Sequence, residues 1–150
     1  MKTWSHEAVI DANIEKVWQL FNGSLEDMQK VMPNVIENEL VKEGKNNVGT
    51  VYRQKYQEGK RVQEYEVKTL EYENEAERKR LKVGFNLANM FDITAKYELE
   101  KLEEHQTLFK YTTTNNPLKW YIKPLVKLAS NKVVVQFVDR VKEVAEAEEQ

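Results

Sequence analysis

The chain has 150 residues, of which 41% are hydrophobic and 32% charged, and its formal net charge is -2. This composition is typical of a soluble globular protein of one domain, here expected over residues 1–150, with a sizeable core, and so small a charge creates no field that would attract nucleic acid. The absence of Cys excludes disulfides, zinc–thiolate sites and a thiol nucleophile.

Hydropathy patterning favours a cytoplasmic protein. The first residues, 1–7, carry a charge within a few positions of every apolar residue, unlike a signal peptide. No stretch approaches the roughly 20 apolar residues of a membrane span, and a chain without Cys suits a reducing compartment. We expect a cytoplasmic location, no stable membrane insertion, and a monomer or weak homodimer.

The first part of the chain has the pattern of a strand followed by two short helices. Alternation over residues 3–11 predicts the strand. Asn13 is placed to cap the first helix, which Asn22-Gly23 ends. Ser24 with Asp27 three residues later predicts the start of a second helix, which runs to Val31.

Three strands are predicted next, over residues 35–43, 48–57 and 61–72, with turn residues between them. In the last of these, Tyr65 and Val67 point one way while Leu70 and Tyr72 point the other. A strand keeps strict alternation unless an extra residue is inserted. We therefore expect a β-bulge between the two pairs.

The last three strands, around 81–87, 91–99 and 109–113, alternate cleanly. The outer positions carry charged residues, and we interpret Arg78-Lys79-Arg80 as a solvent-exposed strand edge. One charged and one apolar face indicate an antiparallel sheet covered on one side only. The apolar face carries Leu81, Val83, Phe85, Leu87, Phe91, Ile93, Tyr97, Leu99, Phe109, Tyr111 and Thr113.

A long helix is predicted over residues 117–146, with Asn116 as its N-cap and Pro117 in its first position. Pro124 should kink it. Its charges oppose the helix dipole, with lysines early and glutamates late, and we interpret them as solvated. The lysines are Lys119, Lys123, Lys127 and Lys132, and the glutamates are Glu143, Glu146, Glu148 and Glu149.

Three segments together resemble one family: residues 10–18, with the sequence Ile-Asp-Ala-Asn-Ile-Glu-Lys-Val-Trp, residues 48–52 and residues 139–146. In order and spacing they are similar to the START / Bet v-type (SRPBCC) superfamily, in its polyketide cyclase/dehydrase-like branch. The resemblance implies an α+β helix-grip fold, in which a curved seven-stranded antiparallel sheet surrounds a long C-terminal helix beside two short N-terminal helices. It also implies a cavity that holds lipids, polyketides or similar molecules.

Several tyrosines and apolar residues are expected on the inner face of the sheet and on the last helix. Buried Tyr hydroxyls need partners, so this mixture favours a pocket for a ring-containing, mostly apolar ligand with a few oxygens, without metal or organic cofactor. The alternative is that these aromatic residues simply fill the core. The candidate ligand-binding residues are Tyr52, Tyr56, Tyr65, Phe85, Phe91, Ile93, Tyr97, Phe109, Tyr111, Tyr121, Leu125 and Leu128.

Two other functions stay open from the sequence. One is a cyclase, dehydratase or hydrolase using the same cavity, with His6 or a tyrosine as proton donor, although a buried histidine is more often structural. Asp92 is expected on the exposed face, and His105 in an exposed turn. The other is a partner-binding module that uses the outer sheet or the basic start of the last helix, which could also attract an anionic lipid.

Overall fold

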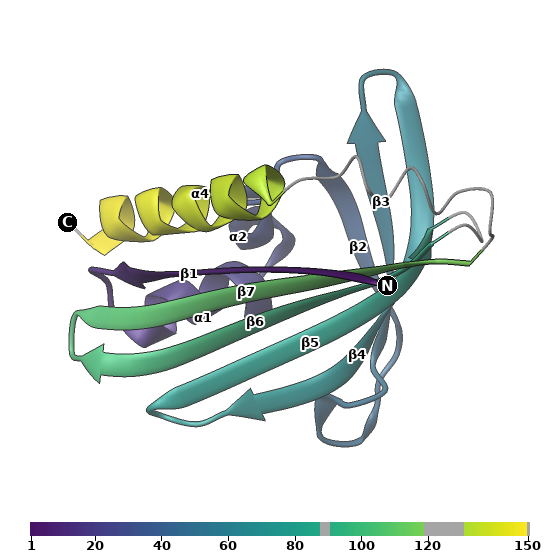
Figure 1. The fold of residues 1–150 in the computed structure, drawn as a ribbon. Coiled ribbons are helices and arrows are strands. Elements are labelled where there is room, and N and C mark those ends of the chain that lie inside the picture. The colour runs from purple at the N-terminus through teal and green to yellow at the C-terminus, as the bar shows by residue number, and fades with distance from the viewer. Residues whose placement is uncertain (88–90, 119–130, 150) are drawn as a thin grey trace.

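The computed structural model describes residues 1–87, 91–118 and 131–149, and Figure 1 shows a curved sheet with helices on its concave side. The seven strands are antiparallel neighbours in the order β1-β7-β6-β5-β4-β3-β2. This confirms the predicted α+β helix-grip architecture. The elements are β1 (Lys2–Ile10), α1 (Ile14–Asn22), α2 (Leu25–Gln29), β2 (Val35–Lys42), a 3-10 turn η1 (Lys45–Asn47), β3 (Val51–Glu58), β4 (Arg61–Asn74), β5 (Arg78–Leu87), β6 (Phe91–Glu103), β7 (Gln106–Pro117) and α4 (Lys132–Glu149).

Both predicted helix starts are confirmed. The Asn13 side chain accepts a hydrogen bond from the Glu15 amide at 2.9 Å and caps α1. Ser24 and Asp27 form a reciprocal capping box at the start of α2. These side chains satisfy amides that a helix start would otherwise leave unpaired.

β4 contains the predicted bulge, but the bulge lies at Leu70 itself, so Leu70 and Tyr72 do not share a face. The register between β4 and β5 shifts between Thr69 and Glu71, so one extra residue is inserted there. Leu70 is consequently exposed, and Tyr72 returns to the face that carries Val67. That face, which we call the inner face, is the one covered by α1 and α4.

The core lies at one end of the inner face, where α1 packs against β6 and β7 and α4 packs against β1 and β7. Phe109 is fully buried and stacks on Phe21 of α1 with ring centroids 5.4 Å apart. Burying a side chain of this size contributes about 1.5–3 kcal/mol. The two helices therefore seal this end of the fold with apolar contacts. The helical residues of the core are Ile14, Val17, Trp18, Leu20, Phe21, Val138, Val141 and Ala145.

Lys79 corrects the interpretation of Arg78-Lys79-Arg80 as a solvent-exposed edge. Lys79 is only 2% exposed, because alternation along β5 places it on the inner face directly beneath α1. Its Nζ lies 2.9 Å from a carboxylate oxygen of Glu15 and donates to the Glu75 carbonyl at 3.0 Å and to the Asn74 side chain. The ammonium also lies 5.8 Å from the centre of the Trp18 ring. Lys79 thus joins β5 to α1.

The end of β7 corrects the predicted start of the last helix. Asn116 and Pro117 do not cap a helix but pair with Asp92 and Phe91 of β6. The long β6 partner extends the ladder this far, and Pro is tolerated at a strand end because it has no amide to donate. Helical structure is confirmed from Lys132 to Glu149, and the predicted kink at Pro124 lies outside the described residues.

The glutamates at the end of α4 are bound to neighbouring elements, which corrects their interpretation as solvated charges. Glu146 accepts from the Asp11 amide at 2.8 Å, and Glu149 from the Asn13 amide at 3.3 Å. Glu149 also pairs with Lys16 at 3.2 Å and contacts His105. These carboxylates lie at the N-terminus of α1, where the helix dipole favours negative charge. The unfavourable charge order of α4 is therefore offset by α1.

These contacts hold the pKa of both carboxyl groups below the ordinary value. For Glu146 the main cause is the hydrogen bond from the Asp11 amide, followed by Lys142. For Glu149 it is the contact with His105, followed by the Asn13 amide and Lys16.

No helix among the described residues combines the length and apolar character that crossing a membrane requires.

Lys79→Met should lower the free energy of unfolding by about 1–3 kcal/mol, because the acceptors on Asn74 and Glu75 lose their buried donor. The variant keeps the chain length of the side chain, so lost packing contributes little. Urea denaturation followed by circular dichroism measures the change. Arg78→Met, at the exposed neighbouring position, is the control and should differ from wild type by less than about 0.5 kcal/mol; equal losses in both variants would contradict the role of Lys79.

The docking of α4 predicts a loss of stability in acid. Because folding lowers the pKa of Glu146 and Glu149 below 4.5, their contribution is present above that pH and is lost as the pH falls through the lowered pKa. The double variant Glu146→Gln/Glu149→Gln should therefore lose less stability on acidification than wild type. Urea unfolding at a series of pH values tests this.

The matched control is Glu143→Gln, which removes an exposed carboxylate from the same helix. It should show the wild-type dependence of stability on pH. If the double variant also followed the wild-type curve, the two carboxylates would not hold α4 against α1.

Candidate functional site

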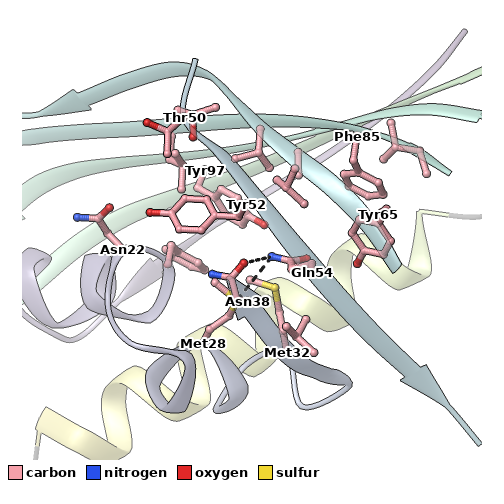
Figure 2. Close-up of a pocket in the computed structure, with 18 of the residues that line it drawn as sticks. Asn22, Met28, Met32, Asn38, Thr50, Tyr52, Gln54, Tyr65, Phe85 and Tyr97 are labelled. Carbon is pink, nitrogen blue, oxygen red and sulfur yellow. Dashed lines mark hydrogen bonds between the residues drawn. The ribbon is translucent and has the colours of Figure 1, made fainter. Parts of the chain in front are cut away.

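A cavity of about 340 Å³ lies between the inner face of the sheet and the two short helices. It adjoins the packed end of the core, with which it shares Phe21, Ala95 and Tyr97, and it extends toward β2, β3 and β4. Figure 2 shows a close-up of its walls. Its lining comprises Phe21, Asn22, Gly23, Met28, Met32, Val35, Asn38, Asn47, Thr50, Tyr52, Gln54, Tyr56, Tyr65, Val67, Thr69, Tyr72, Leu81, Val83, Phe85, Ile93, Ala95, Tyr97, Tyr111 and Thr113.

Strand alternation explains why these residues face inward. Along β3, Tyr52, Gln54 and Tyr56 line the cavity, while Arg53 and Lys55 between them form ion pairs with acidic residues of the neighbouring strands. In β4, the bulge at Leu70 shifts the alternation by one residue, so that Thr69 before it and Tyr72 after it both line the cavity. The cavity wall is therefore a direct product of the period-two pattern with one interruption.

One wall of the cavity carries amides and thioethers. The Gln54 amide donates to the Asn38 side-chain oxygen at 3.3 Å and lies 3.9 Å from the Met28 sulfur. Figure 2 shows these groups beside Met32. This contact joins β3 to β2 and α2, so it ties the short helices to the sheet. Methionine side chains are flexible and polarisable and adapt to ligands of irregular shape.

A second wall carries three tyrosines, Tyr65, Tyr97 and Tyr111. Tyr65 stacks on Phe85 with ring centroids 4.9 Å apart, and Tyr97 on Phe21 at 4.6 Å. Tyr97 is only 6% exposed. None of the three hydroxyls forms a hydrogen bond with a residue in the described part of the chain. A hydroxyl in a cavity wall without a protein partner is available to a ligand or to water.

Burial also controls the ionisation of these tyrosines. It raises the pKa of Tyr111 to about 12, and together with the neighbouring Tyr56 it raises the pKa of Tyr65 to about 12. The pKa of Tyr97 is raised well above its ordinary value, first by burial and then by Tyr111 and Tyr65. All three hydroxyls are therefore neutral near pH 7 and can both donate and accept.

Most of the residues singled out from the sequence lie together in the cavity wall. Phe109 does not, because α1 covers it in the packed core, and Phe91 is half-buried outside the lining. Tyr121, Leu125 and Leu128 lie outside the described residues. Those that line the cavity are Tyr52, Tyr56, Tyr65, Phe85, Ile93, Tyr97 and Tyr111.

Sequence reasoning missed the amide and methionine wall. Gln54 was detectable, since it shares the alternation of Tyr52 and Tyr56. Asn38 had no such signal, because the register of β2 shifts between Val35 and Glu37. Met28 lies on α2, whose described residues are not buried, so no apolar stripe marked it.

The candidate tyrosines line the described cavity wall, but the histidine and carboxylate side chains that could transfer a proton do not. His6 is half-buried opposite Tyr111 on the edge strand β1. Asp92 is exposed, as predicted. His105 is also exposed, as predicted, and contacts Glu149. Glu64 points outward and pairs with Arg53 at 3.1 Å.

The raised pKa of the tyrosines predicts a loss of stability in alkali. Below the ordinary tyrosine pKa of 10.0 their contribution is complete, and it is lost as the pH rises toward the folded values of about 12. Tyr65→Phe/Tyr111→Phe should therefore be less sensitive than wild type to a rise in pH above 10.0. Urea unfolding at increasing pH measures this; an equal decline in both proteins would show that the two hydroxyls ionise as freely in the fold as in the unfolded chain.

Solved structures confirm the fold. The Zhui aromatase/cyclase from a Streptomyces strain is similar with a TM-score of 0.74 and 12% identity, covering 99% of this chain and 96% of that one. The di-domain ARO/CYC BexL from the BE-7585A biosynthetic pathway has a TM-score of 0.76 and 11% identity over 97% of this chain. This chain spans 47% of that di-domain protein, about half its length.

Norcoclaurine synthase from Thalictrum flavum, in complex with dopamine and hydroxybenzaldehyde, has a TM-score of 0.65 and 17% identity, covering 99% of this chain and 88% of that one. No curated protein matches the sequence. The model of the family described as polyketide cyclase / dehydrase and lipid transport matches residues 1–146. The chain therefore belongs to the polyketide cyclase / dehydrase and lipid transport family.

Proposed function

We propose that the protein binds a hydrophobic, ring-containing small molecule in the cavity between the sheet and the short helices. The observation that carries this proposal is a hollow of about 340 Å³ lined by aromatic and aliphatic side chains. Pockets for small organic ligands typically have volumes of about 300–1,000 Å³ and such a mixed lining. The family description, which includes lipid transport, supports the same class of function.

The cost of an empty interior supports the proposal. Protein cores pack as densely as organic crystals, and voids larger than a water molecule are few. Here the same sheet is fully packed around Phe109 and hollow beside Tyr52 and Tyr65. The hydroxyls of Tyr65, Tyr97 and Tyr111 have no hydrogen-bond partner among the described residues and remain available to a ligand or to water in this space. A ligand with oxygen atoms would fill the space and satisfy these hydroxyls at once.

A catalytic role is the second candidate. Two of the similar structures are named as aromatase/cyclases, and Tyr97 and Tyr111 are the hydroxyls placed to donate a proton to a bound molecule. A tyrosine with a pKa of about 12, as for Tyr111, is a weak acid at neutral pH. Binding is therefore the function that the described cavity supports first.

Filling the cavity should weaken binding without unfolding the protein. Val83 lines the cavity, so Val83→Trp should weaken binding of the neutral fluorescent dye N-phenyl-1-naphthylamine by about tenfold or more, a change that corresponds to about 1.4 kcal/mol. The dye's fluorescence increase on titration measures the affinity. Phe109→Ala would not test binding, although the sequence made Phe109 a candidate ligand-binding residue, because removing this core ring should cost about 3–5 kcal/mol of stability.

The matched control is Lys82→Trp, which introduces the same side chain at the adjacent position of β5 but on the outer face, where Lys82 pairs with Glu71. It should bind the dye as wild type does. Unfolding midpoints in urea show that both variants fold. Failure of the wild-type protein to bind the dye, or equal affinity in the two variants, would contradict the cavity as the binding site.

A further inference from the structure

We propose that the cavity selects uncharged ligands and rejects both carboxylates and ammonium ions. This inference rests on the proposed function and narrows its ligand class. Every described side chain that lines the cavity is neutral: it is lined by no Asp, Glu, Lys, Arg or His from the described ranges 1–87, 91–118 and 131–149. Its polar groups are amides and hydroxyls, which donate and accept without carrying charge.

Two cations that alternate with cavity-lining residues along β3 are directed away from the cavity and paired with carboxylates. Along β3, Arg53 pairs with Glu64 at 3.1 Å, and Lys55 with Glu37 at 3.1 Å. Both cations alternate with the inward-facing Tyr52, Gln54 and Tyr56. The ion pairs leave these cations on the outer face, where they cannot neutralise a charge inside the cavity.

An ionic ligand would thus lose its hydration without gaining a counter-charge. Moving an ion out of water is costly unless an opposite charge replaces the lost solvent. The cavity's own tyrosines show the same effect, since burial raises the pKa of Tyr65, Tyr97 and Tyr111 and so disfavours their charged form. A neutral ketone, phenol or alcohol meets no such penalty, because its oxygen can bond to the hydroxyls and amides.

The proposal opposes a reading that the sequence left open, in which a basic helix start attracts an anionic lipid. The two hypotheses predict opposite preferences between a neutral and an anionic ligand that share the same ring system. Charge selection predicts tighter binding of the neutral ligand, and attraction by a basic helix start predicts tighter binding of the anion.

The experiment compares three naphthalenes at pH 7: 2-naphthol, 2-naphthoate and 2-naphthylmethylammonium. Isothermal titration calorimetry on the wild-type protein measures each affinity. We expect 2-naphthol to bind about tenfold or more tightly than either ion. Lowering the pH from about 7 to about 5 should strengthen the apparent binding of the naphthoate, because more of it becomes the neutral acid, and should leave 2-naphthol unchanged.

A charge placed in the wall should reverse the preference. Gln54→Lys puts a cation in the amide wall and should shift the ratio of naphthoate to naphthol affinity by about tenfold or more toward the anion. Gln54→Met, which is similar in size and neutral, is the matched control and should keep the wild-type ratio. Circular dichroism shows that both variants fold.

The outcomes distinguish a failure of charge selection from a failure of the proposed ligand-binding function. If wild-type protein bound 2-naphthoate or the ammonium ion as tightly as 2-naphthol, charge selection would be overturned while ligand binding stood. If it bound none of the three and also failed to bind N-phenyl-1-naphthylamine, the proposed function itself would be overturned.

Discussion

The constraint on which this structure depends is geometric: a strongly curved antiparallel sheet presents more inner surface than its described helices cover. At one end, α1 lies on β6 and β7 and α4 lies on β1 and β7, and side chains such as Phe109 are completely buried there. Toward β2, β3 and β4 the only described helical cover comes from the end of α1 and the short α2. The cavity of about 340 Å³ is the volume left between them.

The packed end of the fold is stabilised by polar contacts that join α1 to α4 and to β5. Glu146 and Glu149 at the end of α4 bind amides at the start of α1, and Lys79 of β5 binds Glu15 from below. Each charge meets a partner of opposite sign or a helix terminus of the favourable sign. The sealed end therefore combines ion pairs with apolar packing, whereas the described cavity wall has apolar and neutral polar groups only. This contrast divides the interior into a part that supports the fold and a part suited to a ligand.

The similarity to aromatase/cyclases and norcoclaurine synthase establishes the fold of this chain, while its chemistry depends on its own side chains. At identities of 11–17% the shared property is the curved sheet with its helices. One fold hosts many functions, and the function belongs to the site. In this chain the described site offers tyrosine hydroxyls, amides and thioethers without a charged group, which suits recognition of a neutral molecule.

Much of the cavity wall could be predicted from the sequence, because alternation in a strand decides locally which way each side chain points. Tyr52, Tyr65 and Tyr97 face the cavity for that reason alone. Short-range capping by Asn13 and Ser24 was predictable on the same grounds, since a cap contacts residues only two or three positions away.

The rest was decided by the tertiary structure, because periodicity tells which face a residue occupies and not which element covers it. Lys79 and Leu81 share a face of β5, but α1 lies over Lys79, so a lysine is buried there with its own partners. Phe109 and Tyr111 share a face of β7, yet only Tyr111 reaches the cavity. Asn116 and Pro117 remain in the sheet because β6 continues beside them. In each case a distant segment of the chain determined the environment of a residue whose direction the sequence had already indicated.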